Sequence, residues 1–312
     1  MADVKKIATR ESYGNALKDL AEEFPNLVVL DADLAGATKT GIFKKAYPDR
    51  HIDCGIAESN MMGIAAGLSL TGKIPFASSF AMFAAGRAFE QVRNSIGYPH
   101  LNVKIGATHA GLTVGEDGAS HQCNEDIALM RTIPGMVVMC PSDDIEAKAA
   151  VRAALEHVGP VYIRFGRAAV PVINDRPDYK FEIGKGQIVR EGKDVTIVAT
   201  GIMVDSALQA AEKLAADGID AEVINICTIK PLDKDIIVNS AKKTGKVVTC
   251  EEHSVIGGLG SAVCDALAEE YPVKVKKIGM QDVFGESGSA SDLLKKYELD
   301  GDGVYKQVKE FV

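Results

Sequence analysis

The sequence predicts an α/β protein with a mostly parallel sheet, followed by a smaller α/β domain. Short apolar strands alternate with amphipathic helices in the first half, the alternation lapses between about residues 168 and 192, and it then resumes. Strictly alternating units imply parallel strands with helices on both faces. We therefore expect one domain at 1–170, a linker at 171–192 and a second domain at 193–312.

The first domain is expected to contain three helices and five strands. Apolar residues at helical spacing predict helices at 11–24, 58–72 and 144–158, the second of which stops at Gly72 and the third of which follows the capping signal Ser142/Asp143. Short apolar runs predict strands, with the sequences NLVVLDAD, IPFASSF, NVKIGATH, MVVMCPSD and VYIRFGR. The order of these elements supports a doubly wound sheet.

The second domain repeats the alternation on a smaller scale. Its predicted strands are DVTIVAT, DAEVINI, KVVTCEE and PVKVKKIG. Its predicted helices are MVDSALQAAEKLAADG, DKDIIVNSAKKTG and LGSAVCDALAEEY. The segment before it carries two prolines, Pro171 and Pro177, and mixed charge, which is typical of a connecting segment.

Composition narrows the class of ligand. The chain has 312 residues, of which 46% are hydrophobic and 25% charged, and its formal net charge is −8. An acidic chain without a basic, aromatic-rich cluster is not expected to bind nucleic acid or a membrane surface, so a small-molecule ligand is favoured. No run is long and apolar enough for a membrane span or signal peptide, and we expect a cytoplasmic protein. The six cysteines lack the spacing of metal ligands, so no metal site is expected in this chain.

Polar residues that follow the predicted strands are the first candidates for function, because ligands bind at the carboxyl ends of parallel strands. His109 and His121 bracket a glycine-rich segment, and long loops with polar residues usually carry function. Asp31 and Asp33 follow another strand, although either can instead cap the next helix. Phe80 and Phe83 lie three positions apart, where both can face one ligand. Other candidates after strands are Arg164, Arg167, Glu251, Glu252 and His253.

Eight segments taken together resemble the pyrimidine-binding and C-terminal domains of transketolases. In chain order they are DADLAGATKT, HIDCGIAESNMMGIAAGLSLTGKIPFASSFAMF, RAFEQVRNS, GATHAGLTVGEDGASHQCNEDIALMRTIPGMVV, PSD, YIRFGR, TIKPLD and EEHSVIGGLGSAV. The resemblance covers essentially the whole chain. It implies the pyrimidine-binding fold of thiamine diphosphate enzymes, followed by a transketolase C-terminal domain.

The resemblance implies roles for four residues at the cofactor. Glu58 matches the glutamate that hydrogen-bonds N1′ of the aminopyrimidine and thereby promotes loss of the C2 proton from the thiazolium ring. Phe80 and Phe83 match the aromatic pocket of the aminopyrimidine, and Asp33 matches an acid near the cofactor. A helix-capping role for Glu58 is the alternative.

Further roles concern the substrate. His109 and His121 resemble groups that contact substrate hydroxyls and transfer protons, so with Glu58 they are the candidate catalytic residues. Asp117 resembles a residue that reads a sugar hydroxyl. Arg10 and Arg167 resemble a pair that grips the sugar phosphate, a task that suits bidentate guanidinium groups. The implied reaction moves a two-carbon ketol unit from a ketose phosphate to an aldose phosphate, as in the pentose phosphate pathway.

Full-length transketolases begin with another domain, which binds the diphosphate and ligates magnesium through a GDG motif and a later asparagine. The only GDG in this sequence lies at 301–303, near the end of the chain. It does not follow a predicted strand, and no asparagine comes after it. We therefore expect the C-terminal half of a split transketolase whose N-terminal subunit supplies the diphosphate and Mg²⁺ site, in an assembly of two copies of each chain. The alternatives are a 1-deoxyxylulose-5-phosphate synthase-like subunit, a 2-oxoacid dehydrogenase beta-like subunit, and a non-catalytic assembly subunit.

Overall fold

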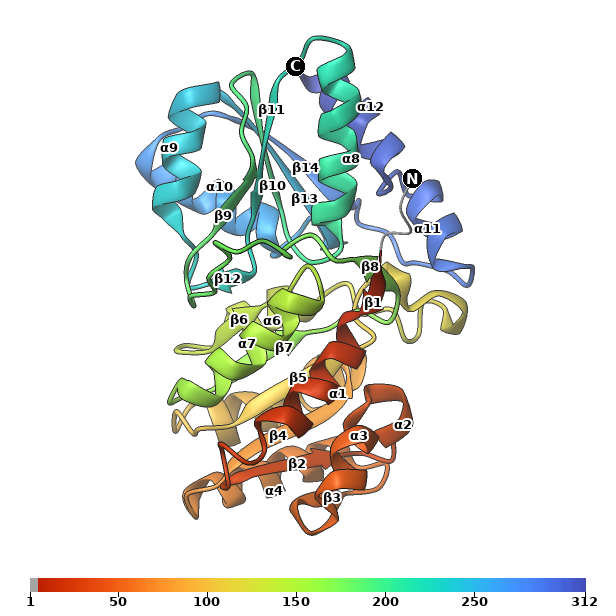
Figure 1. The fold of residues 1–312 in the computed structure, drawn as a ribbon, viewed down its shortest axis with the longest axis vertical. Helices are drawn as coiled ribbons and strands as arrows, with labels where there is room; N and C mark the ends of the chain where they lie inside the picture. Colours follow the sequence, from red (N-terminus) through yellow and green to blue (C-terminus); the bar gives the residue numbers. More distant parts are fainter. Residues whose placement is uncertain (1–4) are drawn as a thin grey trace.

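The computed structural model describes residues 5–312 as two stacked α/β domains (Figure 1). The first domain is built on a seven-stranded sheet in the order β12-β6-β7-β5-β4-β2-β3, parallel except where β12 pairs with β6. Its strands are β2 (Leu27–Asp31), β3 (His51–Asp53), β4 (Ile74–Phe80), β5 (Lys104–Thr108), β6 (Val137–Met139), β7 (Val161–Arg164) and β12 (Thr228–Lys230). The predicted mostly parallel α/β class is confirmed.

Helices cover both faces of this sheet. On one face, buried side chains of α1 and α7 share a core with those of β2 and β7, for example Leu17, Val151, Val29 and Ile163. On the other face, α4 and α6 pack through residues such as Met61 and Met130. Gly72 takes a left-handed φ of 82° just after α4, which ends the helix there as predicted. The helices are α1 (Thr9–Leu20), α2 (Ala35–Thr38), α3 (Thr40–Ala46), α4 (Glu58–Leu70), α5 (Phe89–Gln91), α6 (Asp126–Arg131) and α7 (Asp144–Glu156).

The second domain contains a five-stranded sheet in the order β14-β13-β10-β11-β9. Helices α8 and α12 cover one face, and α9 and α10 cover the other. The strands are β9 (Gln187–Arg190), β10 (Val195–Ala199), β11 (Ala221–Asn225), β13 (Lys246–Ser254) and β14 (Lys274–Met280). The helices are α8 (Met203–Ala216), α9 (Lys234–Thr244), α10 (Leu259–Glu270), α11 (Ala290–Lys296) and α12 (Gly301–Phe311). The GDG at 301–303 opens α12, where Asp300 accepts a hydrogen bond from the Gly303 amide.

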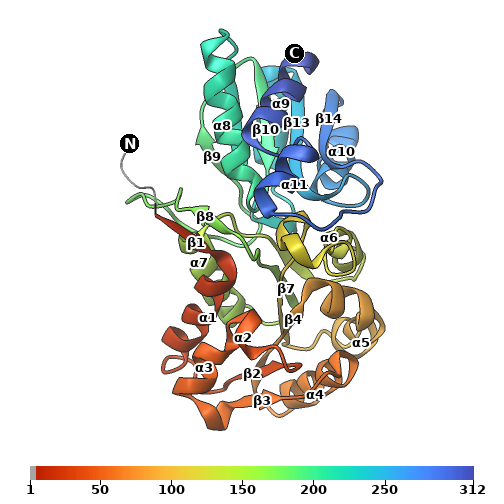
Figure 2. The ribbon, with the colours of Figure 1, turned by 90° about the vertical axis from the view of Figure 1, so that its right-hand side faces the viewer.

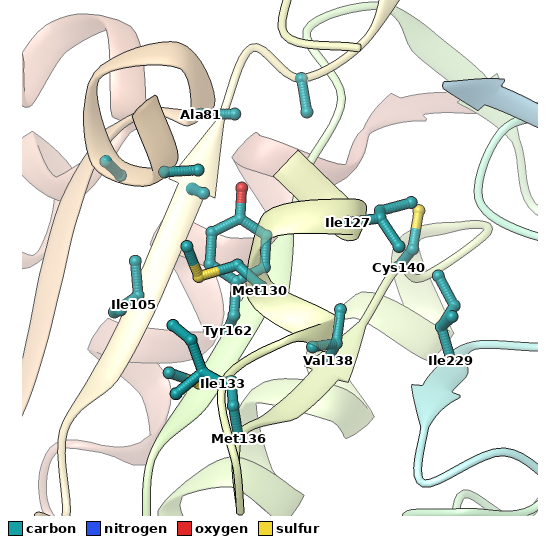
Figure 3. Close-up of a cluster of buried hydrophobic side chains, with 14 of the residues drawn as sticks. Ala81, Ile105, Ile127, Met130, Ile133, Met136, Val138, Cys140, Tyr162 and Ile229 are labelled. Atoms are coloured by element: carbon teal, nitrogen blue, oxygen red, sulfur yellow. The ribbon is translucent and has the colours of Figure 1, made fainter. Parts of the chain in front are cut away.

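The two domains share structure as well as a covalent connection. Strand β12 lies beyond residue 193, yet it pairs antiparallel with β6 of the first sheet. Within residues 171–192, expected to be a linker, β9 joins the edge of the second sheet antiparallel to β11. One apolar core runs across the junction, and Figure 3 shows Ile229 of β12 beside Val138 and Cys140 of the first domain. A two-stranded ribbon of β1 (Lys6–Ala8) and β8 (Ala169–Pro171) completes the junction.

None of the helices between residues 5 and 312 is long and apolar enough to cross a membrane.

Candidate functional site

The site lies at the carboxyl edge of the first sheet, where β4 and β5 end side by side. Phe80 is the last residue of β4, and His109 follows β5 directly. Their rings stack with centroids 3.8 Å apart and an interplanar angle of 25°. The ring of Phe83 stacks on Phe80 at 5.7 Å, and His121 meets both phenylalanines edge-on at 5.5 and 6.2 Å. Four of the residues singled out in the sequence thus form one aromatic cluster: Phe80, Phe83, His109 and His121.

Local backbone geometry produces this cluster. The segment η2 (Met82–Arg87) is a wide π-helical turn directly after β4, and such turns are frequent at functional sites. It carries Phe83 back towards Phe80. His109 adopts a positive φ of 55°, which turns the chain sharply from the strand into the following loop. The sheet thus fixes one half of the cluster, and two irregular segments fix the other.

The hydrogen bonds of His109 define its protonation. Nη1 of Arg10 lies 3.1 Å from Nε2 of His109, and a guanidinium can only donate. Nε2 is therefore the acceptor, and Nδ1–H donates to Oγ1 of Thr108 at 2.9 Å. Burial, together with the positive charges of Arg10 and Arg167, lowers the pKa of His109 to about 3. His109 is thus a neutral imidazole whose tautomer is set by its two neighbours.

Glu58 is buried at the first turn of α4, with only 3% of its surface exposed. Its Oε2 atom has no hydrogen-bond partner. The nearest cation, Nε of Arg87, is 3.7 Å away on a side chain that is mostly exposed. Buried carboxylate oxygens in native proteins are nearly always paired, and an unpaired one is costly. The arrangement therefore fits a ligand that donates a hydrogen bond to this oxygen.

Arg167 and Asp117 lie beside the cluster, on neighbouring loops. Nη1 of Arg167 donates to Oε2 of Glu116 at 2.7 Å and also to the carbonyl of Val114, and it lies 4.0 Å from Oδ2 of Asp117. Asp117 is exposed. The positive charge of Arg167 helps to lower the pKa of Arg10, although burial contributes more. Both arginines therefore add positive charge around His109.

Asp33 occupies a left-handed turn after β2, with φ of 59°, and its side chain is exposed. Its amide donates to Oδ1 of Asp53 at 3.0 Å. The preceding acid, Asp31, accepts from the Leu34 amide at 3.2 Å within this turn, but neither acid caps the next helix, because α2 has no side-chain cap. Asp31 also pairs with Nε2 of His51 at 2.6 Å.

Sequence reasoning missed three contributors to the site, and it named a fourth, Glu116, only as part of the glycine-rich segment. Arg87 approaches Glu58, Glu116 holds Arg167, Thr108 sets the tautomer of His109, and His51 pairs with Asp31. Glu116 stands in the glycine-rich segment already singled out, so its position was signalled. No pattern in the sequence marks the partnership of His51 with Asp31, because the two residues lie on different strands.

Two family models match nearly the entire chain. Residues 5–172 match "Transketolase, pyrimidine binding domain", and residues 184–304 match "Transketolase, C-terminal domain". The chain belongs to the transketolase family. The resemblance seen in the sequence is thereby confirmed.

Curated relatives of similar length include two transketolase chains. The chain is 52% identical to a "Putative transketolase C-terminal section" of Methanocaldococcus jannaschii, with 96% of this chain and 95% of the relative covered. It is 46% identical to the "6-deoxy-6-sulfo-D-fructose transketolase subunit SqwH" of a Clostridium species, with 96% and 93% covered. The human transketolase is 37% identical, with 98% of this chain and 49% of the human protein covered. This transketolase chain thus corresponds in extent to half of the longer enzymes.

A solved structure described as "Split gene transketolase, inactive beta4 tetramer" shares the whole fold. It is 56% identical, superposes with a TM-score of 0.90, and the match covers 98% of each chain. The complex of a Pichia stipitis transketolase with sedoheptulose 7-phosphate superposes at 0.84 with 25% identity, and the match covers 99% of this chain and 46% of that chain. The arrangement of the two domains is therefore that of the transketolase family.

Proposed function

We propose that this chain is the C-terminal subunit of a thiamine diphosphate-dependent transketolase, which moves a two-carbon ketol unit from a ketose phosphate to an aldose phosphate. The observation that carries the proposal is the buried, unpaired Oε2 of Glu58 at the first turn of α4. Family membership and full-length likeness to transketolase chains support the same activity. The comparisons give no support to the three alternatives raised from the sequence.

The residues present fit the pyrimidine end of the cofactor. Glu58 would share a proton with N1′ of the aminopyrimidine in a hydrogen bond, Phe80 and Phe83 would pack against its ring, and Asp33 would lie nearby. Bound thiamine diphosphate would supply the nucleophilic carbon chemistry that ketol transfer requires. Glu58 lies in a water-poor environment, where hydrogen bonds to a carboxylate are strongest.

His109 and His121 would handle substrate hydroxyls and protons. Nε2 of the neutral His109 accepts a hydrogen bond from Arg10, and this contact orients the guanidinium before substrate binds. The ring of His121 meets both phenylalanines edge-on, and its Nδ1 forms a hydrogen bond with Oγ of Ser120 at 2.9 Å. These contacts fix the ring at the cluster. Together the two imidazoles would give the site hydrogen-bond donors and acceptors beside Phe80 and Phe83.

The substrate phosphate would bind between Arg10 and Arg167. Two guanidinium groups match a phosphate dianion in charge and geometry, whereas a neutral sugar needs neither. Asp117 lies 4.0 Å from Arg167 and is exposed, so it can accept from a sugar hydroxyl beside the phosphate. Glu116 competes for Arg167 in the free chain and must share it with the substrate.

The rest of the site would come from other chains. A separate N-terminal subunit would bind the diphosphate and ligate Mg²⁺, and two copies of each chain would form the enzyme, in the cytoplasm and within the pentose phosphate pathway. The relative described as an inactive beta4 tetramer supports a chain of this kind that associates with itself and needs a partner to be active.

The direct test is ketol transfer from xylulose 5-phosphate to ribose 5-phosphate with thiamine diphosphate and Mg²⁺. We expect no activity from this chain alone and full activity when the candidate N-terminal chain is added. Full activity of this chain alone would contradict the split site. Inactivity of the mixture with sugar phosphates of any length would favour a non-catalytic assembly subunit.

A further inference from the structure

We propose that Glu252, in the second domain, is a positioning residue for the loop that carries the substrate-contacting side chains of the first domain. The site loop, residues 110–123, runs from the end of β5 past Asp117 to His121. The amide of Thr113 in this loop donates to Oε2 of Glu252 at 3.0 Å, across 139 residues of sequence. Both partners are buried.

Glu252 is itself held by a network of charged side chains between the domains. Nη2 of Arg164 donates to the backbone carbonyl of Glu252 at 2.9 Å, and Nη1 of Arg164 lies 3.7 Å from Oε1. Nε of Arg164 donates to both carboxylate oxygens of Asp126, at 3.2 and 3.0 Å. All three charged groups are at least 97% buried, so water does not screen them. The acceptor offered to the site loop is therefore fixed in place.

The site loop is packed directly against this network. A Cβ atom on Gly111 would lie 2.5 Å from Cδ of Glu252 and 2.8 Å from Nη2 of Arg164, and Gly111 has a left-handed φ of 78°. At the other end of the loop, Nε2 of Gln122 donates to the carbonyls of Leu112 at 3.0 Å and of Glu286 at 2.9 Å. Figure 2 shows α11 of the second domain next to this yellow segment. The second domain thus holds the site loop at both ends.

The contact has a consequence for substrate binding, which rests on the proposed function. The carbonyl of Val114 and the carboxylate of Glu116 hold Arg167, and both belong to the site loop. A loop that is released at Thr113 therefore moves the acceptors of Arg167 together with Asp117 and His121. Glu58 belongs to a different element, so its environment stays unchanged.

Glu251 provides a matched control. It precedes Glu252 on β13, is equally buried, and also accepts backbone N–H groups, from Leu259 at 2.7 Å and Gly260 at 2.8 Å. Those amides open α10, on the other face of the strand. Removal of Glu251 therefore tests general destabilisation of β13 without touching the site loop.

The first experiment measures amide hydrogen exchange in this chain alone, so it does not depend on catalysis. In Glu252→Ala, exchange in peptides covering 110–123 is expected to rise ~10-fold or more, as on loss of a charge-assisted hydrogen bond. In Glu251→Ala the increase is expected near 257–262 instead. If Glu252→Ala fails to fold, Gly111→Ala is the substitute, because its Cβ would clash with Glu252 and displace the loop. It should raise exchange in the same 110–123 peptides. Equal exchange of the site loop in wild type and in every Glu252 or Gly111 variant that folds would overturn the proposal.

The second experiment uses the enzyme reconstituted with its N-terminal partner. Glu252→Ala should raise KM for the ketose phosphate ~10-fold while kcat changes less than ~3-fold, and Glu251→Ala should leave KM unchanged. A fall in kcat at unchanged KM, or the same KM increase in both variants, would contradict a positioning role. If the wild-type mixture is inactive, the proposed function fails, and the exchange experiment still decides whether Glu252 holds the loop.

Discussion

Arg10 donates from Nη1 to Nε2 of His109 at 3.1 Å, and this contact joins the start of α1 to the end of β5. An arginine cannot accept a hydrogen bond, so the contact is lost when His109 takes up a proton. Protonation would also bring two positive charges together in a buried setting. The relationship therefore determines the charge state of His109.

We predict that His109 stays neutral at pH 5, with a pKa of about 3 lowered by burial and by Arg10, Arg167, His121 and Lys39. Below about pH 6.5 the unfolded chain binds a proton at this histidine and the folded chain does not, so the free energy of unfolding decreases as pH falls towards 3. Nitrogen-15 NMR of the imidazole measures the pKa directly. Arg10→Gln should raise it, and a wild-type His109 that titrates near 6.5 would contradict the geometry.

Replacing Glu58 by Gln should separate stability from activity. The substitution removes a buried charge whose Oε2 has no hydrogen-bond partner and only an exposed Arg87 side chain at 3.7 Å, so the melting temperature should be unchanged or higher. Because the carboxylate is proposed to act in proton transfer, kcat of the reconstituted enzyme should fall ~10²–10⁴-fold. Steady-state kinetics and thermal unfolding measure the two effects, with the exposed Glu90→Gln on α5 as control. A Glu58→Gln variant with the turnover of the wild type would contradict the proposed role of Glu58 in proton transfer.

Arg167→Lys should discriminate phosphorylated from neutral substrates. Lysine cannot form the bidentate contact of a guanidinium, so KM for a ketose phosphate should rise ~10-fold. A ketose without phosphate should show no change, since it makes no such contact. Arg152→Lys serves as control, because Arg152 forms a bidentate pair with Glu23 on the surface of the first domain. Equal effects on both substrates would argue against a phosphate contact.

The buried pair of Asp31 and His51 should stabilise the end of β2. Burial alone would raise the pKa of Asp31, but hydrogen bonds from His51, Thr40 and the Leu34 amide lower it overall. The contribution is therefore present above the ordinary pKa of 3.8 and is lost as pH falls through the lowered value. Asp31→Ala should cost ~3–5 kcal/mol in urea unfolding, because it leaves His51 without its partner. Thr40→Val, which removes one hydrogen bond, should cost ~1 kcal/mol, and equal costs would contradict a special role of the pair.

Periodicity in the sequence determined the class of the fold and the edge of the sheet that carries the site. Alternation of strands with helices requires parallel strands, and parallel strands end at one edge. His109 and the Phe80/Phe83 pair stand directly at such ends, so they could be identified locally. The segments that contain IAESN (56–60) and GEDGASHQ (115–122) then resembled the transketolase family, which the comparisons confirmed.

Tertiary structure alone decided the partners of these residues. The strand at 228–230 joins the sheet of the other domain, and no local pattern states which edge a strand will join. The same holds for the unpaired Oε2 of Glu58 and for the hydrogen bond between Thr113 and Glu252. Periodicity records which face of an element is buried, whereas the choice of a buried polar partner depends on how distant elements pack. The sequence by itself therefore determined the elements and the family, and only the packed structure decided which charges are paired and which remain available to a ligand.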